Sequence, residues 1–510
     1  MSPSFYTLIE ASFPEDRSRI ALEAPGREHG LEEWSFQRLS SAAARYAALF
    51  AALGLARGDR VALQVEKSPE ALVIYLACLR GGFVFLPMNT AYRPDEVDYL
   101  VGDAEPALIV CDPSMEASHQ EIAARHGSPH LLTLDAEAHG SLVDKALAVT
   151  DALPPATCGA NDLAAILYTS GTTGKPKGAM LSHGNLAANG LALRDAWRFT
   201  ENDVLLHALP IFHAHGLFVA CHCALLSAAK MIWRQKFDRA DVLRQLPRAT
   251  VFMGVPTFYT RLLAGNDFNR DLVDHMRLFT SGSAPLLAET FDEFRARTGH
   301  AILERYGMTE TGMNTSNPYE GERRAGTVGF PLPGVEVRVV DGEDRPLASG
   351  EIGGLQVRGP NVFTGYWRMP EKSAEEFTAD GEGWFRTGDV AMIDSDGYVH
   401  LVGRAKDLII SGGFNVYPKE IEELIDDMPE VLESAVVGVP HEDFGEAGVA
   451  VVVLREGESL DEATLLPRLK ERIANYKVPK RAFFVESLPR NTMGKVQKNL
   501  LRDSYREACR

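Results

Sequence analysis

Short apolar segments alternate with helical patterns along the first third of the chain, and this alternation restricts the fold more than any other feature. The segments RVALQV (60–65), PALIVC (106–111) and LAAILYTS (163–170) have the length and composition of buried strands, whereas SSAAARYAALFAAL (40–53) is typical of a helix. Consecutive parallel strands need long crossover connections, which are usually helices. The pattern therefore predicts parallel β-sheets covered by helices, and 510 residues are enough for more than one such core.

The second half of the chain changes pattern twice. Residues 334–360 form short alternating segments separated by Gly and Pro, which predicts a small antiparallel β unit. The last hundred residues have the size and mixed pattern of a compact α+β domain. We therefore expect a fold that is part α/β and part α+β. A large N-terminal domain of helix-covered sheets plus the small β unit would span residues 1–403, and a small C-terminal α+β domain would span residues 404–510.

The chain is acidic, with a formal net charge of -18. Nucleic acids and anionic membranes attract cationic surfaces, so neither is an expected partner. The N-terminal segment carries acidic residues where a targeting peptide needs cationic ones, and no apolar run approaches the roughly 20 residues that span a bilayer. These features predict a cytoplasmic protein without membrane insertion and leave its oligomeric state open.

The stretch ILYTSGTTGKPKGAMLSHGN (166–185) has the composition of a phosphate-binding loop. A turn rich in Gly, Ser and Thr after a buried strand can aim backbone N–H groups and hydroxyls at phosphate oxygens, and lysines add positive charge. The P-loop of NTPases needs Ser or Thr directly after its Gly-Lys pair. Here Pro176 follows Lys175, which argues against a P-loop NTPase.

Further motifs follow the glycine-rich stretch in a fixed order. They are LPIFHAHG (209–216), SGSAPL (281–286), ERYGMTET (304–311), WFRTGD (384–389), GRAKDLIISGGFNVYPKEIE (403–422) and LPRNTMGKVQK (488–498). Together they closely resemble the adenylate-forming superfamily, which includes acyl-CoA synthetases, peptide-synthetase adenylation domains and firefly luciferase. The resemblance implies a two-step reaction. A carboxylate attacks the α-phosphate of ATP to give an acyl-adenylate and pyrophosphate, and a thiol, usually that of coenzyme A, then displaces AMP.

The resemblance also implies which residues bind ATP and Mg²⁺. The hydroxyl of Thr309 would meet the α-phosphate, and Glu310 would hold Mg²⁺, a hard cation that prefers carboxylate oxygen. Asp389 would accept both ribose hydroxyls, with Arg404 as its partner. The remaining positions would form the loop around the β- and γ-phosphates (Thr169, Ser170, Gly171, Thr172, Thr173, Gly174 and Lys177) and the adenine slot (Ser283, Ala284, Pro285 and Tyr306).

Two lysines near the C-terminus receive different expectations. Lys495 resembles the catalytic lysine that reaches the α-phosphate and the substrate carboxylate, whereas we expect Lys498 to be a solvated charge. Lys406 falls at the hinge position of the family, near 404–407, about which the mobile C-terminal domain would turn between the half-reactions. That rotation would replace Lys495 with the segment around Gly412 and Gly413, where small residues leave room for the pantetheine arm of coenzyme A.

The segments that line the acyl pocket in this family carry basic residues here. A buried charge without a partner is costly, so an inward-facing basic residue predicts a substrate with a second carboxylate. We expect Arg261 to hold that carboxylate, helped by His215 or His213, with Arg277 as a weaker alternative. His213 also lies where the family has an aromatic gate between the acyl site and the coenzyme A tunnel, so a catalytic role is open to it.

Several stretches, including MGVPTFYTRLL (253–263) and SGGFNVYPKEIE (411–422), also resemble bacterial malonyl-CoA synthetases. This implies an ATP-dependent malonate–CoA ligase whose substrates are malonate, ATP and coenzyme A; such enzymes often accept methylmalonate. The alternatives are a ligase for another short or aromatic carboxylic acid and an adenylation enzyme that charges a carrier protein. A nucleotide-binding regulator without catalysis is disfavoured because Glu310 and Lys495 are both present.

Overall fold

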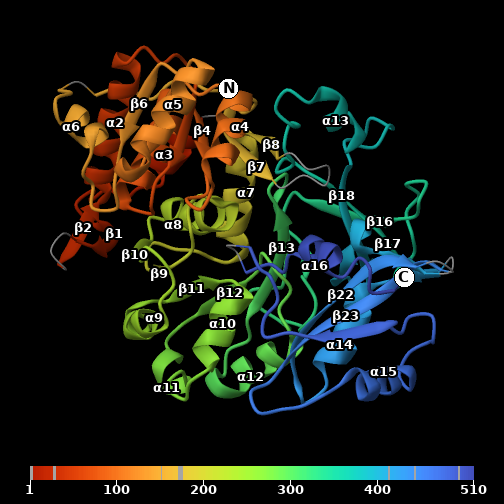
Figure 1. Ribbon diagram of the computed structural model, residues 1–510. Coiled ribbons are helices and arrows are strands. Elements are labelled where there is room, and N and C mark those ends of the chain that lie inside the picture. The colour runs from red at the N-terminus through yellow and green to blue at the C-terminus, as the bar shows by residue number, and fades with distance from the viewer. Residues whose placement is uncertain are drawn as a thin grey trace.

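The computed structural model describes residues 4–26, 30–150, 152–169, 176–411, 414–441, 444–491 and 494–509. Within these residues the strands form four sheets, which we call the N-terminal, central, small and C-terminal sheets. Helices pack around the N-terminal and central sheets, and the C-terminal residues lie against the central part of the chain (Figure 1). The expected combination of helix-covered sheets with a small β unit and a C-terminal α+β domain is confirmed.

The N-terminal sheet is parallel except at one edge, where β7 and β8 form an antiparallel pair. Its strands, in spatial order, are β6 (His130–Thr133), β5 (Leu108–Cys111), β3 (Arg60–Gln64), β4 (Val84–Pro87), β7 (Leu163–Thr169) and β8 (Lys177–Ser182). Its helices are α2 (Phe36–Ala52), α3 (Pro69–Gly81), α4 (Pro94–Ala104), α5 (Glu116–His126) and α6 (Ser141–Leu147). Every residue of α3 is buried, so this helix belongs to the core rather than to the surface.

The central sheet is parallel from β13 to β1 and ends in antiparallel strands on both sides. Its spatial order is β15 (Phe330–Pro331), β14 (Gly312–Ser316), β13 (Leu303–Met308), β12 (Leu278–Ser281), β11 (Val251–Gly254), β9 (Val204–His207), β10 (Lys230–Trp233), β1 (Ile20–Pro25) and β2 (Leu31–Ser35). The helices of this region are α1 (Phe5–Ala11), α7 (His183–Ala196), α8 (His222–Leu225), α9 (Arg239–Gln245), α10 (Pro256–Leu263), α11 (Arg270–Val273) and α12 (Ala288–Thr298). A π-helical segment, η3 (His215–Cys221), leads into α8.

The small sheet is antiparallel, with the order β16 (Glu336–Val340), β17 (Ile352–Arg358), β18 (Phe385–Ile393) and β19 (Val399–Arg404), and α13 (Pro370–Glu375) lies between its strands in the sequence. The C-terminal sheet contains β20 (Ile409–Ser411), β21 (Phe414–Val416), β22 (Val431–His441), β23 (Gly445–Leu454) and β24 (Arg481–Phe484). Its helices are α14 (Pro418–Asp426), α15 (Glu462–Lys470) and α16 (Lys498–Ser504).

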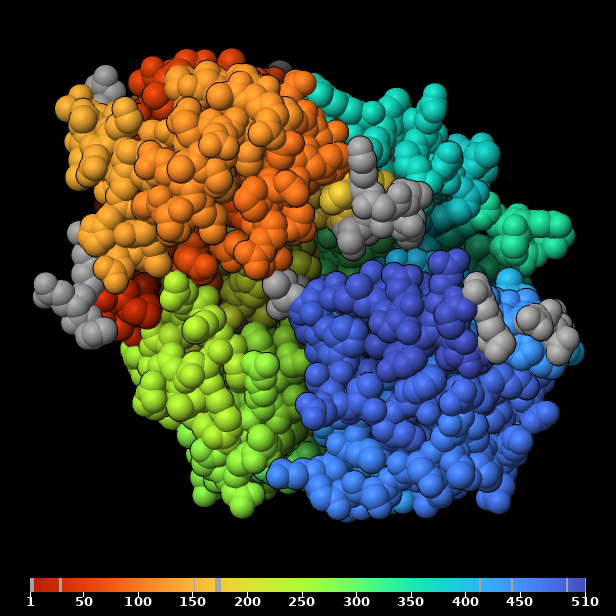
Figure 2. Space-filling model, viewed as in Figure 1, coloured from red at the N-terminus to blue at the C-terminus, as the bar shows by residue number. Residues whose placement is uncertain are grey.

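The chain passes from the small sheet to the C-terminal sheet through a single short turn, η5 (Ala405–Asp407), between the end of β19 and the start of β20. Lys406 is exposed in this turn. The domain boundary at 403/404 and the hinge at Lys406 coincide with this change of sheet and remain predictions about motion. The space-filling view shows the C-terminal residues packed along the side of the central region (Figure 2). In the described part of the chain, no helix is both long and apolar enough to cross a membrane.

Candidate active site

The base of the expected phosphate loop is an antiparallel hairpin in which Thr169 at the end of β7 pairs with Lys177 at the start of β8. The five loop positions Ser170, Gly171, Thr172, Thr173 and Gly174 lie outside the described residues. The Lys177 side chain is only 9% exposed, and its Nζ lies 3.2 Å from Glu376 Oε1 and 4.0 Å from the centre of the Tyr366 ring. Lys177 is therefore held at the base of the loop, beside Tyr366.

Tyr366 connects this lysine to the acidic turn between β13 and β14. Its hydroxyl donates a hydrogen bond of 3.0 Å to Oε1 of Glu310, and Thr309 lies half-buried beside that glutamate. Burial raises the pKa of Glu310, and the positive charges of Arg404 and Lys177 oppose this effect. A carboxylate next to a phosphate loop suits Mg²⁺, which is commonly held by one or two carboxylates together with substrate phosphates.

A second acidic group lies on the small sheet opposite β13. Asp389 in β18 pairs in register with Arg404 in β19, and Arg404 Nε lies 2.9 Å from Asp389 Oδ1. The Tyr306 hydroxyl of β13 donates to the other carboxylate oxygen of Asp389. Burial raises the pKa of Asp389, while Arg404 acts in the opposite direction. This arrangement joins Tyr306, which is expected at the adenine, to Asp389 and Arg404, which are expected at the ribose.

Lys495 lies on a C-terminal turn that reaches this surface. Its backbone N–H donates to Asn491 Oδ1 at 3.0 Å, and the neighbouring Gly494 lies against α10, where an added Cβ would be 3.1 Å from the Thr257 side chain. Lys495 is accessible to solvent, yet the surrounding protein, which limits its hydration, and the nearby Arg404 charge lower its pKa; Asp389 opposes this shift. The described arrangement therefore brings Lys495 into the electrostatic field of the Asp389–Arg404 pair.

The turn that carries Lys495 is anchored on both sides by ion pairs. Arg490 pairs with Glu433 of β22, and Lys498 Nζ lies 2.5 Å from Oε1 of Glu422 in α14. The expectation that Lys498 is a solvated charge is wrong, because its side chain is only 21% exposed and its ammonium group is paired. Position in the motif distinguished Lys495 from Lys498, but it could not show that Lys498 anchors the turn that carries Lys495.

Arg305 is the main residue that sequence reasoning missed. It lies in β13 directly before Tyr306, and because side chains alternate along a strand, it projects from the opposite face. The guanidinium packs against Gly282, where a Cβ would lie 2.2 Å from Arg305 Nη1, so a larger residue could not occupy that position without displacing the arginine. Arg305 is 4% exposed, and its Nε and Nη2 have no hydrogen-bond partner within the described residues.

The two histidines of the LPIFHAHG motif lie near this guanidinium. Burial, together with the Arg305 charge, lowers the pKa of His213 to about 4 and holds the pKa of His215 well below its usual range. His215 Nδ1 lies 3.3 Å from Ser283 Oγ, and its buried Nε2 has no partner in the described residues. Ser283 adopts a positive φ of 72°, which is unusual for a serine.

The structure places the other candidates outside this cluster. Arg261 in α10 is exposed, which does not support the expectation that it is a buried, inward-facing charge of the acyl pocket; it lies one helical turn after Thr257, on the face that meets the Lys495 turn, and its role stays a prediction. Arg277 is excluded because its Nε and Nη2 already donate to the two carboxylate oxygens of Asp203, at 2.5 and 2.7 Å. Ala284 is half-buried and Pro285 is exposed next to Ser283, whereas Gly412 and Gly413 lie outside the described residues.

Comparisons with known proteins agree with this organisation. The family model for the AMP-binding enzyme matches residues 10–367, and the model for the AMP-binding enzyme C-terminal domain matches residues 420–495. The crystal structure of ATP-bound MatB from Rhodopseudomonas palustris is 54% identical in sequence, covers 99% of this chain and 100% of its own, and has a TM-score of 0.95. The apo structure of that protein, with the same identity, covers 100% of both chains and has a TM-score of 0.85.

Two relatives of known activity differ in their acids. Feruloyl-CoA synthase from an Amycolatopsis species is 36% identical over 97% of this chain and 98% of its own length. Malonate–CoA ligase from Arabidopsis thaliana is 34% identical over 99% of this chain and 89% of its own. Similar overall identity to an aromatic-acid enzyme and to a dicarboxylate enzyme leaves the choice of acid to the residues of the pocket.

Proposed function

Because this chain belongs to the AMP-binding enzyme family, we propose that it is an ATP-dependent malonate–CoA ligase. In the first half-reaction, a malonate oxygen attacks the α-phosphorus of ATP and pyrophosphate leaves, which gives malonyl-adenylate. In the second, the thiol of coenzyme A attacks the carbonyl carbon and AMP leaves, which gives malonyl-CoA. Both steps bring anions together, so catalysis consists mainly of positioning and of stabilising negative charge.

The observation that carries the choice of malonate is the buried guanidinium of Arg305, whose Nε and Nη2 have no hydrogen-bond partner among the described residues. A buried charge is costly unless it is paired, and a planar arginine can bind a carboxylate through two parallel hydrogen bonds. The distal carboxylate of malonate supplies that partner, whereas the aromatic ring of ferulate does not. Arg305 therefore takes the role that we first expected of Arg261.

His213 and His215 complete the acyl site as neutral donors. Since their pKa values lie below the usual range, both imidazoles are uncharged near pH 7. A neutral imidazole can donate one N–H to a carboxylate without adding a second positive charge beside Arg305. We propose that the unpartnered Nε2 of His215 donates to the substrate, and that His213 borders the route by which the thiol approaches.

We propose the following roles on the nucleotide side. Asp389 accepts the ribose hydroxyls with Arg404 holding its carboxylate in place, and Tyr306, Ser283, Ala284 and Pro285 border the adenine. Thr309 donates to the α-phosphate, and the loop from Thr169 to Lys177 surrounds the outgoing pyrophosphate. Glu310 would hold Mg²⁺, which when bound would neutralise phosphate charge. Lys495 stabilises the charge that develops on the α-phosphate and the attacking carboxylate.

The C-terminal domain would change its position between the two half-reactions. The greater similarity to the ATP-bound than to the apo structure of MatB supports the interpretation that the described arrangement, with Lys495 at the site, corresponds to adenylation. Rotation about Lys406 would then withdraw Lys495 and bring the segment around Gly412 and Gly413 to the acyl-adenylate, where coenzyme A reacts. We place this enzyme in the cytoplasm, where its small-molecule substrates are available.

The test is AMP formation by the purified protein with ATP, Mg²⁺ and coenzyme A, measured with malonate, methylmalonate, succinate, acetate, octanoate, ferulate and coumarate. We expect AMP release that depends on coenzyme A and is fastest with malonate. Faster turnover of ferulate or coumarate would support an aromatic-acid ligase instead. AMP release that requires a carrier protein rather than coenzyme A would support the carrier-charging alternative.

A further inference from the structure

A buried lysine outside the catalytic cluster connects the N-terminal sheet to the central sheet. Lys67 lies between β3 and α3 and is 7% exposed. Its Nζ lies 2.7 Å from His207 Nδ1, 2.9 Å from the His207 carbonyl oxygen and 2.7 Å from the Arg234 carbonyl oxygen. It also lies 4.3 Å from the centre of the Trp233 ring. The ammonium group therefore has three acceptors, all at the carboxyl ends of β9 and β10.

The chemistry of these contacts determines the tautomer of His207. Its Nε2 lies 2.8 Å from the carbonyl oxygen of Gly216, and a carbonyl can only accept a hydrogen bond. Nε2 must therefore carry the proton. Burial, together with the Lys67 charge, holds the pKa of His207 well below its usual range, so the ring is neutral and its Nδ1 accepts from Lys67.

His207 in turn holds the first residues of the π-helical segment η3. Gly216 is fixed on two sides, since its carbonyl accepts from His207 and an added Cβ would lie 2.0 Å from the Pro210 carbonyl oxygen. The residue directly before it is His215, whose ring contacts Ser283 beside Arg305. π-helical segments are rare, and those that occur are often found at functional sites. A shift of Gly216 would move His215 with it.

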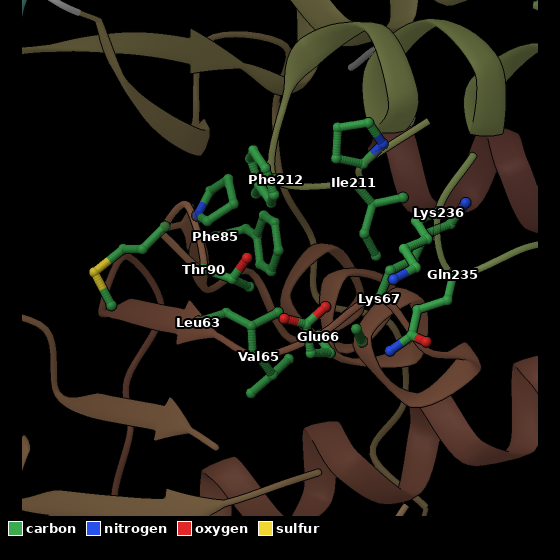
Figure 3. A pocket seen from close by; sticks show the side chains of 14 residues that line it. Leu63, Val65, Glu66, Lys67, Phe85, Thr90, Ile211, Phe212, Gln235 and Lys236 are labelled. Carbon is green, nitrogen blue, oxygen red and sulfur yellow. The ribbon is translucent and has the colours of Figure 1, made fainter. Parts of the chain in front are cut away.

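Lys67 also borders a cavity of about 180 Å³ at the carboxyl ends of β3 and β4 (Figure 3). The next two strands in the chain, β4 and β5, pair with opposite edges of β3, so the strand order reverses at this point. In open α/β sheets, ligands bind at such a topological switch point. Phe212, the residue before His213, forms another part of the wall. Lys236 lines the same cavity and is exposed, so the chain contains a second lysine with which Lys67 can be compared.

We propose that Lys67 is a positioning residue for acid selection: through His207 and the Gly216 carbonyl it holds His215 at the distance from Arg305 at which both contact the distal carboxylate. This proposal depends on the proposed function only in taking malonate as the acid. The hydrogen bonds of Lys67 within the described residues go to His207 and Arg234 and not to the proposed nucleotide residues, so its loss should change the use of the acid much more than the use of ATP.

The experiment compares Lys67→Met with Lys236→Met, which makes the same chemical change in the wall of the same cavity. We expect Lys67→Met to raise KM for malonate at least tenfold while KM for ATP stays within twofold, and we expect Lys236→Met to change neither. A parallel rise of both KM values in Lys67→Met, or an equal effect of Lys236→Met, would overturn the proposal, because a general loss of structure would not distinguish the two substrates.

A double-mutant cycle with His207→Gln tests the connection, and the His207→Gln single variant, with the same expected rise in KM for malonate at an unchanged KM for ATP, serves alone if Lys67→Met does not fold. If Lys67 acts through His207, the single variants should have similar effects on KM for malonate and the double variant should be no worse than either. Multiplying effects would contradict the connection. If the wild-type enzyme prefers another acid, the proposed function fails, and the same cycle run with that acid still decides the role of Lys67.

Discussion

Replacement of Arg305 by methionine removes the charge at the acyl site and keeps most of the side-chain volume. Burial lowers the pKa of the Arg305 guanidinium to about 10, which means that the ligand-free protein holds this charge unfavourably. Exchange of a buried, poorly compensated charge for an apolar side chain is often neutral or stabilising. We therefore expect the thermal unfolding midpoint of ligand-free Arg305→Met to stay the same or to rise.

The effect on malonate should have the opposite sign. Removal of one partner of a buried ion pair costs about 3 to 5 kcal/mol, because the other charge remains buried without a partner. Since about 1.4 kcal/mol is a factor of ten in rate, kcat/KM for malonate should fall by roughly 10² to 10⁴. Isovalerate, in which an isopropyl group replaces the distal carboxylate, should be used as well as before or better.

The assay is ATP–pyrophosphate exchange with each acid, and Arg261→Met is the matched control. Arg261 is exposed, so its replacement should change kcat/KM for malonate less than twofold. A malonate kcat/KM in Arg305→Met within twofold of wild type would refute the assignment. An equal loss with malonate and isovalerate would refute it as well, because a second carboxylate would then have no special role.

Four further variants, at three positions, test the nucleotide side and the hinge. Lys495→Ala should slow adenylation by about 10² to 10³ and leave thioester formation from supplied malonyl-adenylate intact; equal loss in both half-reactions would contradict the role. Because the pKa of Lys495 is lowered, its charge is lost at a lower pH than that of a free lysine, so wild-type adenylation should decline on the alkaline side before pH 10.5, and Lys495→Arg should lack this decline. Glu310→Gln should raise the Mg²⁺ concentration needed for half-maximal adenylation, measured by titration at fixed ATP, and an unchanged requirement would argue against a metal ligand. Lys406→Pro should stall thioester formation more than adenylation in single-turnover assays; intact thioester formation would count against the hinge.

The sequence pattern predicted the helix-covered sheets well, because burial on both faces selects apolar residues along the whole length of a strand. The apolar segments at 60–65, 106–111 and 163–170 correspond to β3, β5 and β7, and the segments at 334–360 correspond to β16 and β17, two of the four strands of the small sheet. The motif order also located the groups around Asp389, which the small sheet brings to β13 through Tyr306. Contacts of this kind could be predicted because both partners belong to motifs whose positions in the family fold are implied by the resemblance.

The choice of arginine could not be predicted in this way. The acyl-pocket prediction used the helix that carries Arg261, whereas Arg305 lies in the ERYGMTET motif, which was assigned to the nucleotide and Mg²⁺. Successive side chains of a strand point to opposite faces, so one strand can contribute to both sites. Which face meets the pocket depends on how β13 packs against β12, where Gly282 leaves space for the guanidinium. A charge inside an otherwise buried strand was the available signal. The ion pair of Lys498 could not be predicted either, because its partner Glu422 is distant in the sequence.

The most direct test of the central claim is the ratio of kcat/KM for malonate to that for isovalerate in the wild-type enzyme. It is measured as AMP release with saturating ATP, Mg²⁺ and coenzyme A, with the thioester product identified by mass. If Arg305 binds a second carboxylate in a buried pocket, the ratio should be at least about 100, as a buried charge pair of roughly 3 kcal/mol requires. A ratio near one, or a higher kcat/KM for ferulate than for malonate, would contradict the account.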